Sequence, residues 1–443
     1  MLLNGLLTFA ETMESIGGIL LAILILLAMV TVHEFGHYVA GKILGFKINE
    51  FSVGFGPALF EKRSKKTGEL FALRLIPLGG YCAFDGEDEL DEEENSQEPS
   101  AEEPFAEMTE KTENDGGRVA TNFETNAETE VESPSLSNVE TEAETQALQG
   151  NVEEYPEPQG ERFNDQPPWK RIIVLIAGAT MNYLLALVLI VLMFACIGRP
   201  VYRVERAVPT SGAETVSAKS QDTVLEVFTW QTGDVILEIN GKTPYLITDY
   251  IDAFNGKKVG EQVPVLIRRD GKEQSVQVTM LTDVNCVNMT DTGTLLRAIG
   301  FTTGDMLVSQ TEKDGFFETL GHSFLYSFKI GGTVLRSLGE LLTGKLGMDS
   351  VGGPVTTITL TAEAATNGWA SFLSIAAFIG VNLAVFNLLP IPALDGCKVI
   401  FCIIEWIFKK PVNRKVEAII NFVGIILLFG FAILVDLLQL FAW

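Results

Sequence analysis

Four long apolar runs dominate the pattern of hydrophobic and polar positions along the chain. They cover Ile16 to about Ala40, Ile172–Ile197, Ala370–Leu394 and Val416–Ala442. Each run contains the roughly 20 residues that a helix needs to cross the hydrocarbon core of a bilayer. The first run has no basic segment before it, so we do not expect a cleavable signal peptide there. The pattern therefore predicts an α-helical polytopic membrane protein with four transmembrane helices.

Lysine and arginine residues are distributed unevenly between these runs. Residues 38–81 hold seven of them, two more directly precede the second run, five lie in 395–415, and none precedes the first run. Basic loops are retained on the cytoplasmic side of a membrane. We therefore expect these loops to be cytoplasmic, and both termini and the segment 198–369 to be extracytoplasmic.

A single acidic segment explains the composition, which combines 47% hydrophobic residues with a net charge of −25. Residues 85–166 hold 27 Asp and Glu but only 3 Lys and Arg. This segment has too few large apolar residues to offset its chain entropy, so we expect a disordered cytoplasmic insert. It is either a solvated spacer or a docking site for a cytosolic partner. The chain shows no basic face of the kind that nucleic-acid binding requires.

The segment after the first run, residues 46–84, alternates strand-like stretches with turn signals. Gly54 and Gly56 interrupt an otherwise aromatic strand that contains Phe55. The pattern predicts a β-hairpin region. It either dips towards a membrane-embedded site, where a strand edge could pair with an extended peptide, or lies on the cytoplasmic surface.

Residues 200–283 have the pattern of a soluble α+β domain. A strand at GDVILEINGK, a helix near 247–255 and a hairpin turning at Asp270-Gly271 together resemble a PDZ domain. Such domains bind peptides at a sheet edge, although folds are often reused without their function. Residues 316–346 follow with apolar residues at helical spacing and three interrupting charges, so we expect an amphipathic helix in the membrane interface.

The strongest chemical signal is His33-Glu34-Phe35-Gly36-His37, an HExxH sequence inside the first apolar run. Residues four apart share one face of a helix, so both imidazoles can reach one metal ion while Glu34 reaches its water. An ionisable residue at a span centre costs about 2.5–3.5 kcal/mol on insertion scales. Three such residues together imply a compensating partner, and Zn²⁺ is the natural one.

A catalytic zinc site takes a third protein ligand and keeps an open position. The candidate is Asp395, the only acidic residue in or bordering the third run. Alternating spans place it at the inner end of the third helix, at a depth similar to that of the histidine pair. Pro390 and Pro392 break or kink the helix just before it, which lets the carboxylate turn inward. The alternative is that Asp395 is only a helix-end or turn residue before Gly396.

Three asparagines also lie within the apolar runs, namely Asn182, Asn382 and Asn387. Buried amides in lipid need hydrogen-bond partners. These side chains could stabilise an oxyanion or hold an extended substrate, and they could equally join helices to one another. Gly178 could permit a close approach between two helices.

Several motifs together make the chain similar to the site-2 protease family, in particular to its bacterial regulator-of-sigma-E branch. They are HEFGH at 33–37, GFGP at 54–57, PLGGY at 77–81, the GDVILEING module and NLLPIPALDG at 387–396. The resemblance covers about 19–84 and 167–441. It implies an intramembrane zinc metalloprotease with one Zn²⁺ per chain.

The resemblance also assigns residue roles. It implies that His33, His37 and Asp395 bind the zinc and that Glu34 is the general base. Substrate-holding positions match Asn382 and Asn387, and the hairpin edge with Gly54, Phe55 and Gly56. Such enzymes lie in the bacterial cytoplasmic membrane and cut single-span membrane proteins, often anti-sigma factors or remnant signal peptides, after a first protease has acted.

This sequence departs from the family pattern in three places. The insert 85–166 has no counterpart among the family features, Gly178-Ala179 stands where relatives often have Gly-Pro, and one PDZ-like module is visible where some relatives carry two. The expected segments are 1–45 (first transmembrane helix), 46–84 (membrane-reentrant hairpins), 85–166 (acidic insert), 167–198 (second helix), 199–285 (PDZ-like domain), 286–369 (linker and interfacial helix), 370–397 (third helix) and 398–443 (basic loop and fourth helix).

Two other functions fit parts of the sequence. A non-catalytic membrane scaffold would bind peptides through the PDZ-like domain, but it has no need of a carboxylate such as Glu34 beside two metal ligands. A metal transporter usually needs more spans and paired intramembrane carboxylates, whereas only Asp395 is evident.

Overall fold

The computed structural model describes residues 2–87, 155–206, 228–284, 292–301, 306–347 and 351–441. In this part of the chain, four helices are long and apolar enough to cross a membrane. They are α1 (Leu2–Leu44), α3 (Pro168–Cys196), α8 (Trp369–Asn387) and α10 (Arg414–Phe441). The four predicted spans are confirmed as helices, although the third ends at Asn387 rather than Leu394.

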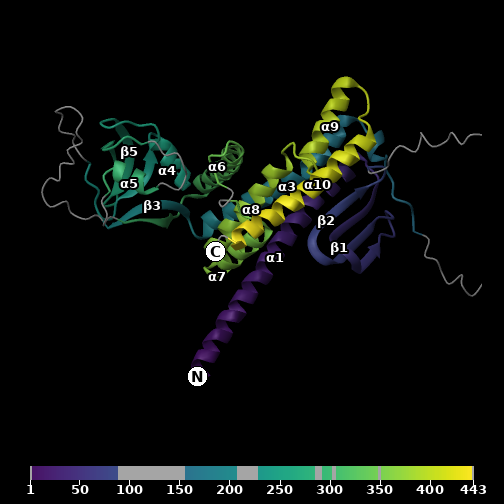
Figure 1. The fold of residues 1–443 in the computed structure, drawn as a ribbon, viewed down its shortest axis with the longest axis horizontal. Helices are drawn as coiled ribbons and strands as arrows, with labels where there is room; N and C mark the ends of the chain where they lie inside the picture. Colours follow the sequence, from purple (N-terminus) through teal and green to yellow (C-terminus); the bar gives the residue numbers. More distant parts are fainter. Residues whose placement is uncertain are drawn as a thin grey trace, which may run out of the picture.

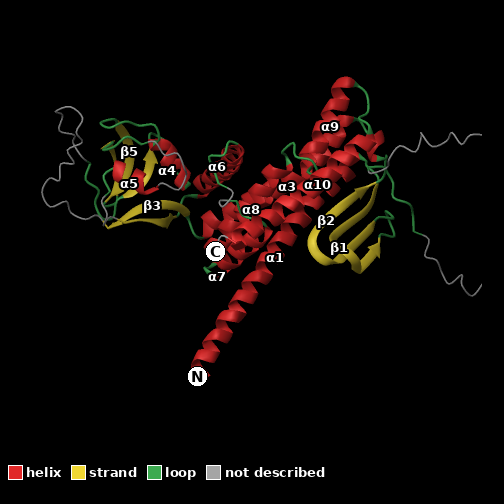
Figure 2. Cartoon of the chain, viewed as in Figure 1, coloured by secondary structure: helices red, strands yellow, loops and turns green. Residues whose placement is uncertain are grey.

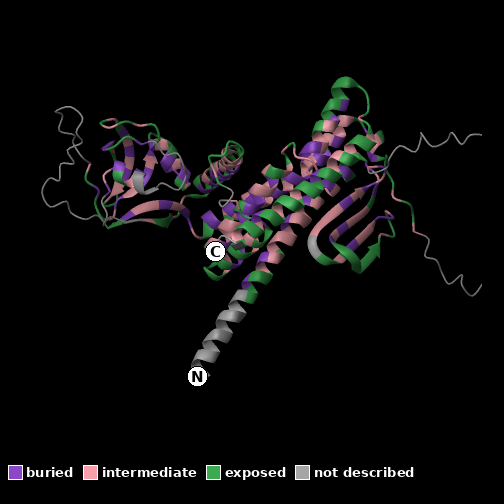
Figure 3. Ribbon diagram, in the orientation of Figure 1, coloured by how far each residue is buried: buried purple, intermediate pink, exposed green. Residues whose placement is uncertain are grey.

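Helix α3 lies at the centre of the bundle and packs against α1, α8 and α9 (Asp395–Phe408), as Figure 1 shows. The crossing of α1 and α3 is very close, because a Cβ on Gly36 would collide with the backbone of Ala177 and Gly178. The outer face of the bundle is largely exposed (Figure 3), and many of its exposed residues are large and apolar. On α10, more than 60% of the surface of Ile419, Phe422, Leu427 and Phe429 is exposed. Such a surface is suited to lipid.

Strands β1 (Ile48–Arg63) and β2 (Leu70–Phe84) form an antiparallel sheet beside α1. Both strands bend back, so that Phe51 of β1 faces both Phe71 and Cys82 of β2. This sheet confirms the β-hairpin that the sequence predicts for residues 46–84. It lies on the opposite side of the helix bundle from the second sheet of the molecule (Figure 2).

A buried carboxylate fixes this hairpin to α1. Glu69 is 2% exposed; it accepts hydrogen bonds from the hydroxyls of Tyr38 at 3.1 Å and Thr67 at 3.0 Å, and it pairs with Lys42. The Tyr38 ring also packs edge-on against Phe51. Since Tyr38 directly follows His37, the hairpin is attached close to the HExxH sequence.

The acidic insert is shorter than the sequence predicts. Its central residues, 88–154, lie outside the described residues, but both of its ends are folded. Phe163 begins a short 3-10 helix, η2 (Phe163–Asp165), and its N–H donates to the carbonyl of Asp85 at 2.7 Å. The Phe163 ring lies 5.4 Å from those of Phe46 and Phe84. Residues at both ends of the expected insert 85–166 therefore belong to the core, because an aromatic residue anchors them.

A second sheet follows α3. Its strands are β3 (Arg199–Arg206), β4 (Val235–Ile239), β5 (Gln262–Arg269), β6 (Lys272–Thr279) and β7 (Met306–Glu312), in the order β6-β5-β4-β3-β7, with helices α4 (Ile247–Phe254) and α5 (Thr292–Ala298). The predicted hairpin turn is confirmed, since Asp270 and Gly271 have φ of 50° and 74° between β5 and β6. Because β7 pairs with β3, this module continues past the expected boundary at residue 285.

Helix α6 (Phe316–Leu342) confirms the predicted amphipathic helix and joins the second sheet to the bundle. Lys329 forms an ion pair with Asp249 of α4 at 2.5 Å, and His322 lies 2.5 Å from the hydroxyl of Tyr245. Large apolar side chains remain exposed on it, namely Phe316, Phe317, Phe324 and Phe328. Helix α7 (Pro354–Thr366), which the sequence analysis does not predict, follows and packs on α1.

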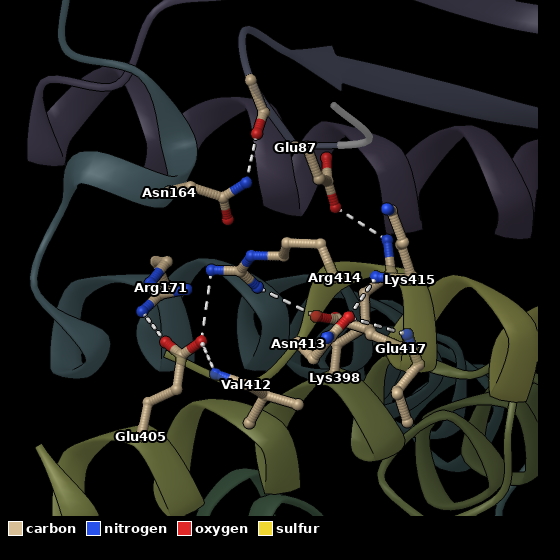
Figure 4. Close-up of polar contacts among 12 residues, drawn as sticks. Glu87, Asn164, Arg171, Lys398, Glu405, Val412, Asn413, Arg414, Lys415 and Glu417 are labelled. Carbon is tan, nitrogen blue, oxygen red and sulfur yellow. Dashed lines mark hydrogen bonds and ion pairs between the residues drawn. The ribbon is translucent and has the colours of Figure 1, made fainter. Parts of the chain in front are cut away.

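The region after α8 differs from the expectation. Residues 388–394 form turns, and Asp395 begins a separate helix, α9, where a basic loop was expected from residue 398. A buried ion-pair network that the sequence does not reveal connects this helix to its neighbours (Figure 4). Glu405 of α9, 5% exposed, pairs with Arg171 of α3 and, at 3.1 Å, with Arg414 of α10. The network holds α9 against both helices.

Candidate metal centre

The two histidines of HExxH face one point inside the bundle. Both lie in the continuous helix α1, four residues apart, and both are buried, with 9% of His33 and 7% of His37 exposed. Their Nε2 atoms are 3.2 Å apart. This spacing is the one that the i, i+4 geometry predicts for two ligands of a single ion.

Asp395 completes the group. Its Oδ2 lies 3.0 Å from Nε2 of His33 and 3.3 Å from Nε2 of His37. The turn before α9 aims this carboxylate: Ala393 has φ of 76°, and its N–H donates to Oδ1 of Asn421 at 3.3 Å. The structure therefore brings together His33, His37 and Asp395, as the sequence predicts, although Asp395 comes from α9 and not from the third transmembrane helix.

The three ligand atoms fit zinc. They form a triangle with sides of 3.0, 3.2 and 3.3 Å. Zinc–ligand bonds of about 2.0–2.1 Å give a tetrahedron whose edges are about 3.3 Å. Oδ2 of Asp395 is buried and makes no hydrogen bond within the described residues. This buried oxygen and the two imidazole nitrogens that it faces supply three donor atoms. A catalytic zinc site has three protein ligands and a fourth, open position.

Backbone groups of α3 shape this centre. Nδ1 of His37 lies 2.8 Å from the carbonyl oxygen of Val174, so that its N–H donates there and Nε2 is left free for a metal. A Cβ on Gly178 would stand 2.7 Å from Cε1 of His33 and would also collide with Nε2 of His37. The close helix approach suggested for Gly178 is therefore present, and it occurs directly at the histidine rings.

Glu34 lies on the side of α1 that faces the hairpin. It is half-buried, and a Cβ on Gly80 of β2 would be 3.3 Å from its Cγ. Gly80 itself is in the PLGGY motif. The side chain of Glu34 thus lies against the β2 segment around Gly80.

The asparagines occupy different positions. Asn387, the last residue of α8, places Nδ2 at 3.3 and 3.4 Å from the two ring nitrogens of His33. Asn182 of α3 is 1% exposed and lies 3.4 Å from Nδ1 of His33. Asn382 is half-buried on α8, five residues before Asn387 and therefore roughly 140° away around the helix.

Gly54, Phe55 and Gly56 lie on β1 and contact residues of the neighbouring strand β2. Phe55 is exposed, and its ring stacks on that of Tyr81, with centroids 6.4 Å apart. It also covers Gly79, the neighbour of Gly80. Gly54 lies against the carbonyls of Arg74 and Ile76, and the guanidinium of Arg74 donates to the carbonyl of Gly56 at 2.9 Å.

Two contributors escaped the sequence analysis. Val174 acts through its carbonyl oxygen, so no property of its side chain could reveal it. Asn421 of α10 holds the turn before Asp395 from 28 residues further along the chain. Gly80, which lies against Glu34, is different, because the sequence marks it as part of the PLGGY motif.

Comparison with known proteins agrees with this geometry. Residues 21–431 match the family model described as peptidase family M50. The chain is 28% identical to the regulator of sigma-W protease RasP of Bacillus subtilis (strain 168), covering 91% of this chain and 93% of that protein. It is 27% identical to the zinc metalloprotease RasP of Geobacillus kaustophilus, covering 98% of each. It is 30% identical to a putative zinc metalloprotease of Staphylococcus aureus (strain MRSA252), covering 92% of this chain and 94% of that protein.

Proposed function

The chain belongs to peptidase family M50, the site-2 proteases, as a zinc-dependent membrane metalloprotease, and we propose that it hydrolyses peptide bonds within the membrane-spanning segments of single-span proteins. The observation that carries the proposal is the triangle of His33, His37 and Asp395 with Glu34 beside it. The ligands lie on or directly next to helices long enough to cross a membrane.

The chemistry follows from the positions of the side chains. Bound zinc would polarise the scissile carbonyl and lower the pKa of a water at the open position. Glu34 accepts the proton of the attacking water and delivers it to the leaving amide nitrogen. His37 is held in the correct orientation by the Val174 carbonyl. Gly178 leaves space for both rings.

The substrate must be extended, because the peptide bonds of a helix are shielded by the helix itself. The β2 segment around Gly80 passes beside Glu34, and an extended peptide could pair with a strand edge there. Gly54, Phe55 and Gly56 support this part of the hairpin from the neighbouring strand. Asn387, with its amide beside His33, would hold the substrate carbonyl, and Asn382 would hold the chain further along α8.

Topology and substrate choice are proposed on the distribution of charge and on the family. Because basic residues cluster near Lys42, Arg171 and Arg414, we propose that the hairpin lies on the cytoplasmic side of a bacterial membrane and that the second sheet and both termini lie outside. One relative is named as a regulator of sigma-W protease. We therefore propose membrane-anchored anti-sigma factors or remnant signal peptides as substrates, after another protease has trimmed them.

Two substitutions test the centre. Glu34→Gln should retain zinc and lower cleavage of a single-span model substrate by roughly 10²–10⁴, since only the proton acceptor is lost. Asp395→Asn should instead deplete zinc, because a neutral amide is a weaker ligand. Zinc per chain and cleavage would be measured on both variants in one detergent. A Glu34→Gln protein that cleaves at the wild-type rate would end the proposal. So would a wild-type protein that binds peptides without zinc and does not cleave them, because a non-catalytic scaffold would behave in this way.

The PDZ-like module is proposed to select trimmed substrates, since the described residues of the module include none of the proposed ligands. Replacing residues 199–312 with a flexible linker removes the whole sheet, including β7. The variant should cleave full-length and trimmed substrates at similar rates, whereas the intact protein should prefer the trimmed form. An unchanged preference in an active variant would contradict this role.

A further inference from the structure

The ring of His33 presents a second nitrogen to α3. Its Nε2 faces Asp395 at 3.0 Å, and its Nδ1 lies 3.4 Å from the side-chain amide of Asn182. Asn182 is 1% exposed, and its Oδ1 is a buried atom without a hydrogen-bond partner in the described residues. A buried amide with one unpaired atom, placed against a ligand ring, requires an explanation.

His37 shows what such a partner does. Its Nδ1–H donates to the Val174 carbonyl at 2.8 Å, which fixes the tautomer that leaves Nε2 free for a metal. Val174 and Asn182 belong to the same helix, α3, which runs beside α1. Metal-binding histidines almost always donate their second ring N–H to an acceptor. Among the described residues, the side-chain amides beside the second nitrogen of His33 are those of Asn182 and Asn387.

The orientation of the Asn182 amide matters for the metal. With Nδ2 towards the ring, Nδ1 of His33 must accept, so the ring proton sits on Nε2 and blocks metal binding. A half-turn about the last torsion of Asn182 exchanges the two amide atoms at little steric cost, because they have nearly equal size. Oδ1 then accepts from Nδ1–H, and Nε2 of His33 is free.

Asn387 does not have this geometry. Its Nδ2 is 3.3 Å from Nδ1 and 3.4 Å from Nε2 of His33, so it is nearly equidistant from the two nitrogens. An atom in that position cannot lie along the Nδ1–H bond. Asn387 is also only half-buried, which fits its proposed contact with substrate.

We infer that Asn182 is the positioning residue of His33: its amide oxygen accepts the Nδ1–H bond and holds the ring in the tautomer that binds zinc. The inference rests on the proposed function, because it concerns the same metal centre. It assigns Asn182 to the metal centre and not to helix association alone. It also gives each histidine its own acceptor on α3.

Two substitutions at Asn182 separate the possible roles. Asn182→Leu removes the acceptor at similar size, and the zinc dissociation constant, measured by chelator competition in detergent, should rise about 10–100-fold. Asn182→Asp keeps an acceptor and loses the donor, so its zinc affinity should stay within about threefold of wild type. Thermal unfolding of the zinc-free proteins verifies that each variant is folded. A folded Asn182→Leu protein with wild-type zinc affinity, or an Asn182→Asp protein as weak as Asn182→Leu, would overturn the inference.

A spectroscopic measurement on the wild-type chain does not depend on either variant. The chain has only 3 histidines, so ¹⁵N-labelled histidine gives few ring signals, and His322→Gln assigns one set. In the zinc-loaded protein, His33 and His37 should both show the Nδ1–H tautomer with a slowly exchanging ring proton. A His33 ring without a proton on Nδ1 would overturn the inference. Failure of the wild-type chain to bind zinc or to cleave would instead contradict the proposed function.

Discussion

Gly178 illustrates how strongly single residues constrain the metal centre. Two imidazole rings occupy the space where any larger residue would place its Cβ. Gly178→Ala should therefore displace His33 and His37 and weaken zinc binding by roughly tenfold or more, consistent with the 1–3 kcal/mol that overpacking costs. Alanine has the higher helix propensity, so α3 itself should not be weakened. Zinc affinity measured by chelator competition tests this expectation.

Gly17→Ala is the matched control for this change. Gly17 lies in α1, the helix that carries both histidines, and no atom lies within 4 Å of its ideal Cβ position. Zinc affinity of the control should equal that of the wild type. If both alanine variants bound zinc normally, the rings would have more freedom than the contacts of Gly178 allow.

The sequence alone brings forward the candidate metal-binding residues, because their chemistry is unusual in an apolar run. His33, Glu34, His37 and Asp395 are recognisable by type and spacing, and three of these four converge as expected. The supporting residues are different. Val174 acts through its backbone carbonyl, which every residue type has, so the sequence does not single it out. The sequence alone is equally consistent with Asn182 joining two helices, and only its position beside His33 separates the two roles.

At the scale of elements, α9 is the main departure from the expectation. Lys398, Lys409 and Lys410 suggest a basic loop, whereas the structure has a helix there, and its Glu405 pairs with Arg171, 234 residues earlier. Charge patterns along the chain cannot reveal a partner at that separation. The four spans and the hairpin at Asp270-Gly271 were predictable because their signals are local.

The ion-pair network that holds α9 should be sensitive to the loss of one partner. Glu405→Leu leaves Arg171, 4% exposed, without its carboxylate, and should lower the unfolding free energy by about 3–5 kcal/mol. The double variant Glu405→Leu with Arg171→Leu should recover much of this loss, because no uncompensated charge remains at that position. Arg414 retains Glu417 as a partner at 2.9 Å in both variants.

Thermal unfolding of the three proteins in the same detergent measures the effect. An equal loss of stability in the single and the double variant would show that the lost hydrogen bonds of Glu405 matter more than the unpaired charge. Zinc affinity of the double variant reports whether α9 still presents Asp395 correctly.

At the scale of the whole molecule, we expect different results from deleting residues 88–154 and from deleting the longer segment 85–166, because the ends of the longer segment are folded. Replacing residues 88–154 with a short Gly-Ser linker should leave folding, zinc binding and cleavage of a model substrate intact, because the proposed ligands and the contacts given above for them belong to other, described residues. Replacing residues 85–166 should destabilise the protein, since it removes Phe163 from its contacts with Phe46 and Phe84.

Yield, zinc content and cleavage of both deletion variants check this contrast. Equal behaviour of the two would mean that the aromatic cluster around Phe163 adds little to the fold. Composition predicts a disordered insert over 85–166, but the described residues at its two ends are folded around the buried ring of Phe163, which composition over a window of residues cannot locate.

The position of Asp395, the third proposed ligand, has a consequence for biosynthesis. His37 and Asp395 are separated by more than 350 residues, so a nascent chain contains the histidine pair long before it contains the carboxylate. At a translation rate of about 5–20 residues per second, this interval lasts roughly 20–70 s. During that time the chain cannot assemble a complete centre, and a truncated product that ends before α9 stays inert towards neighbouring proteins. The order of the ligands along the chain thus delays proteolytic activity until insertion is nearly finished.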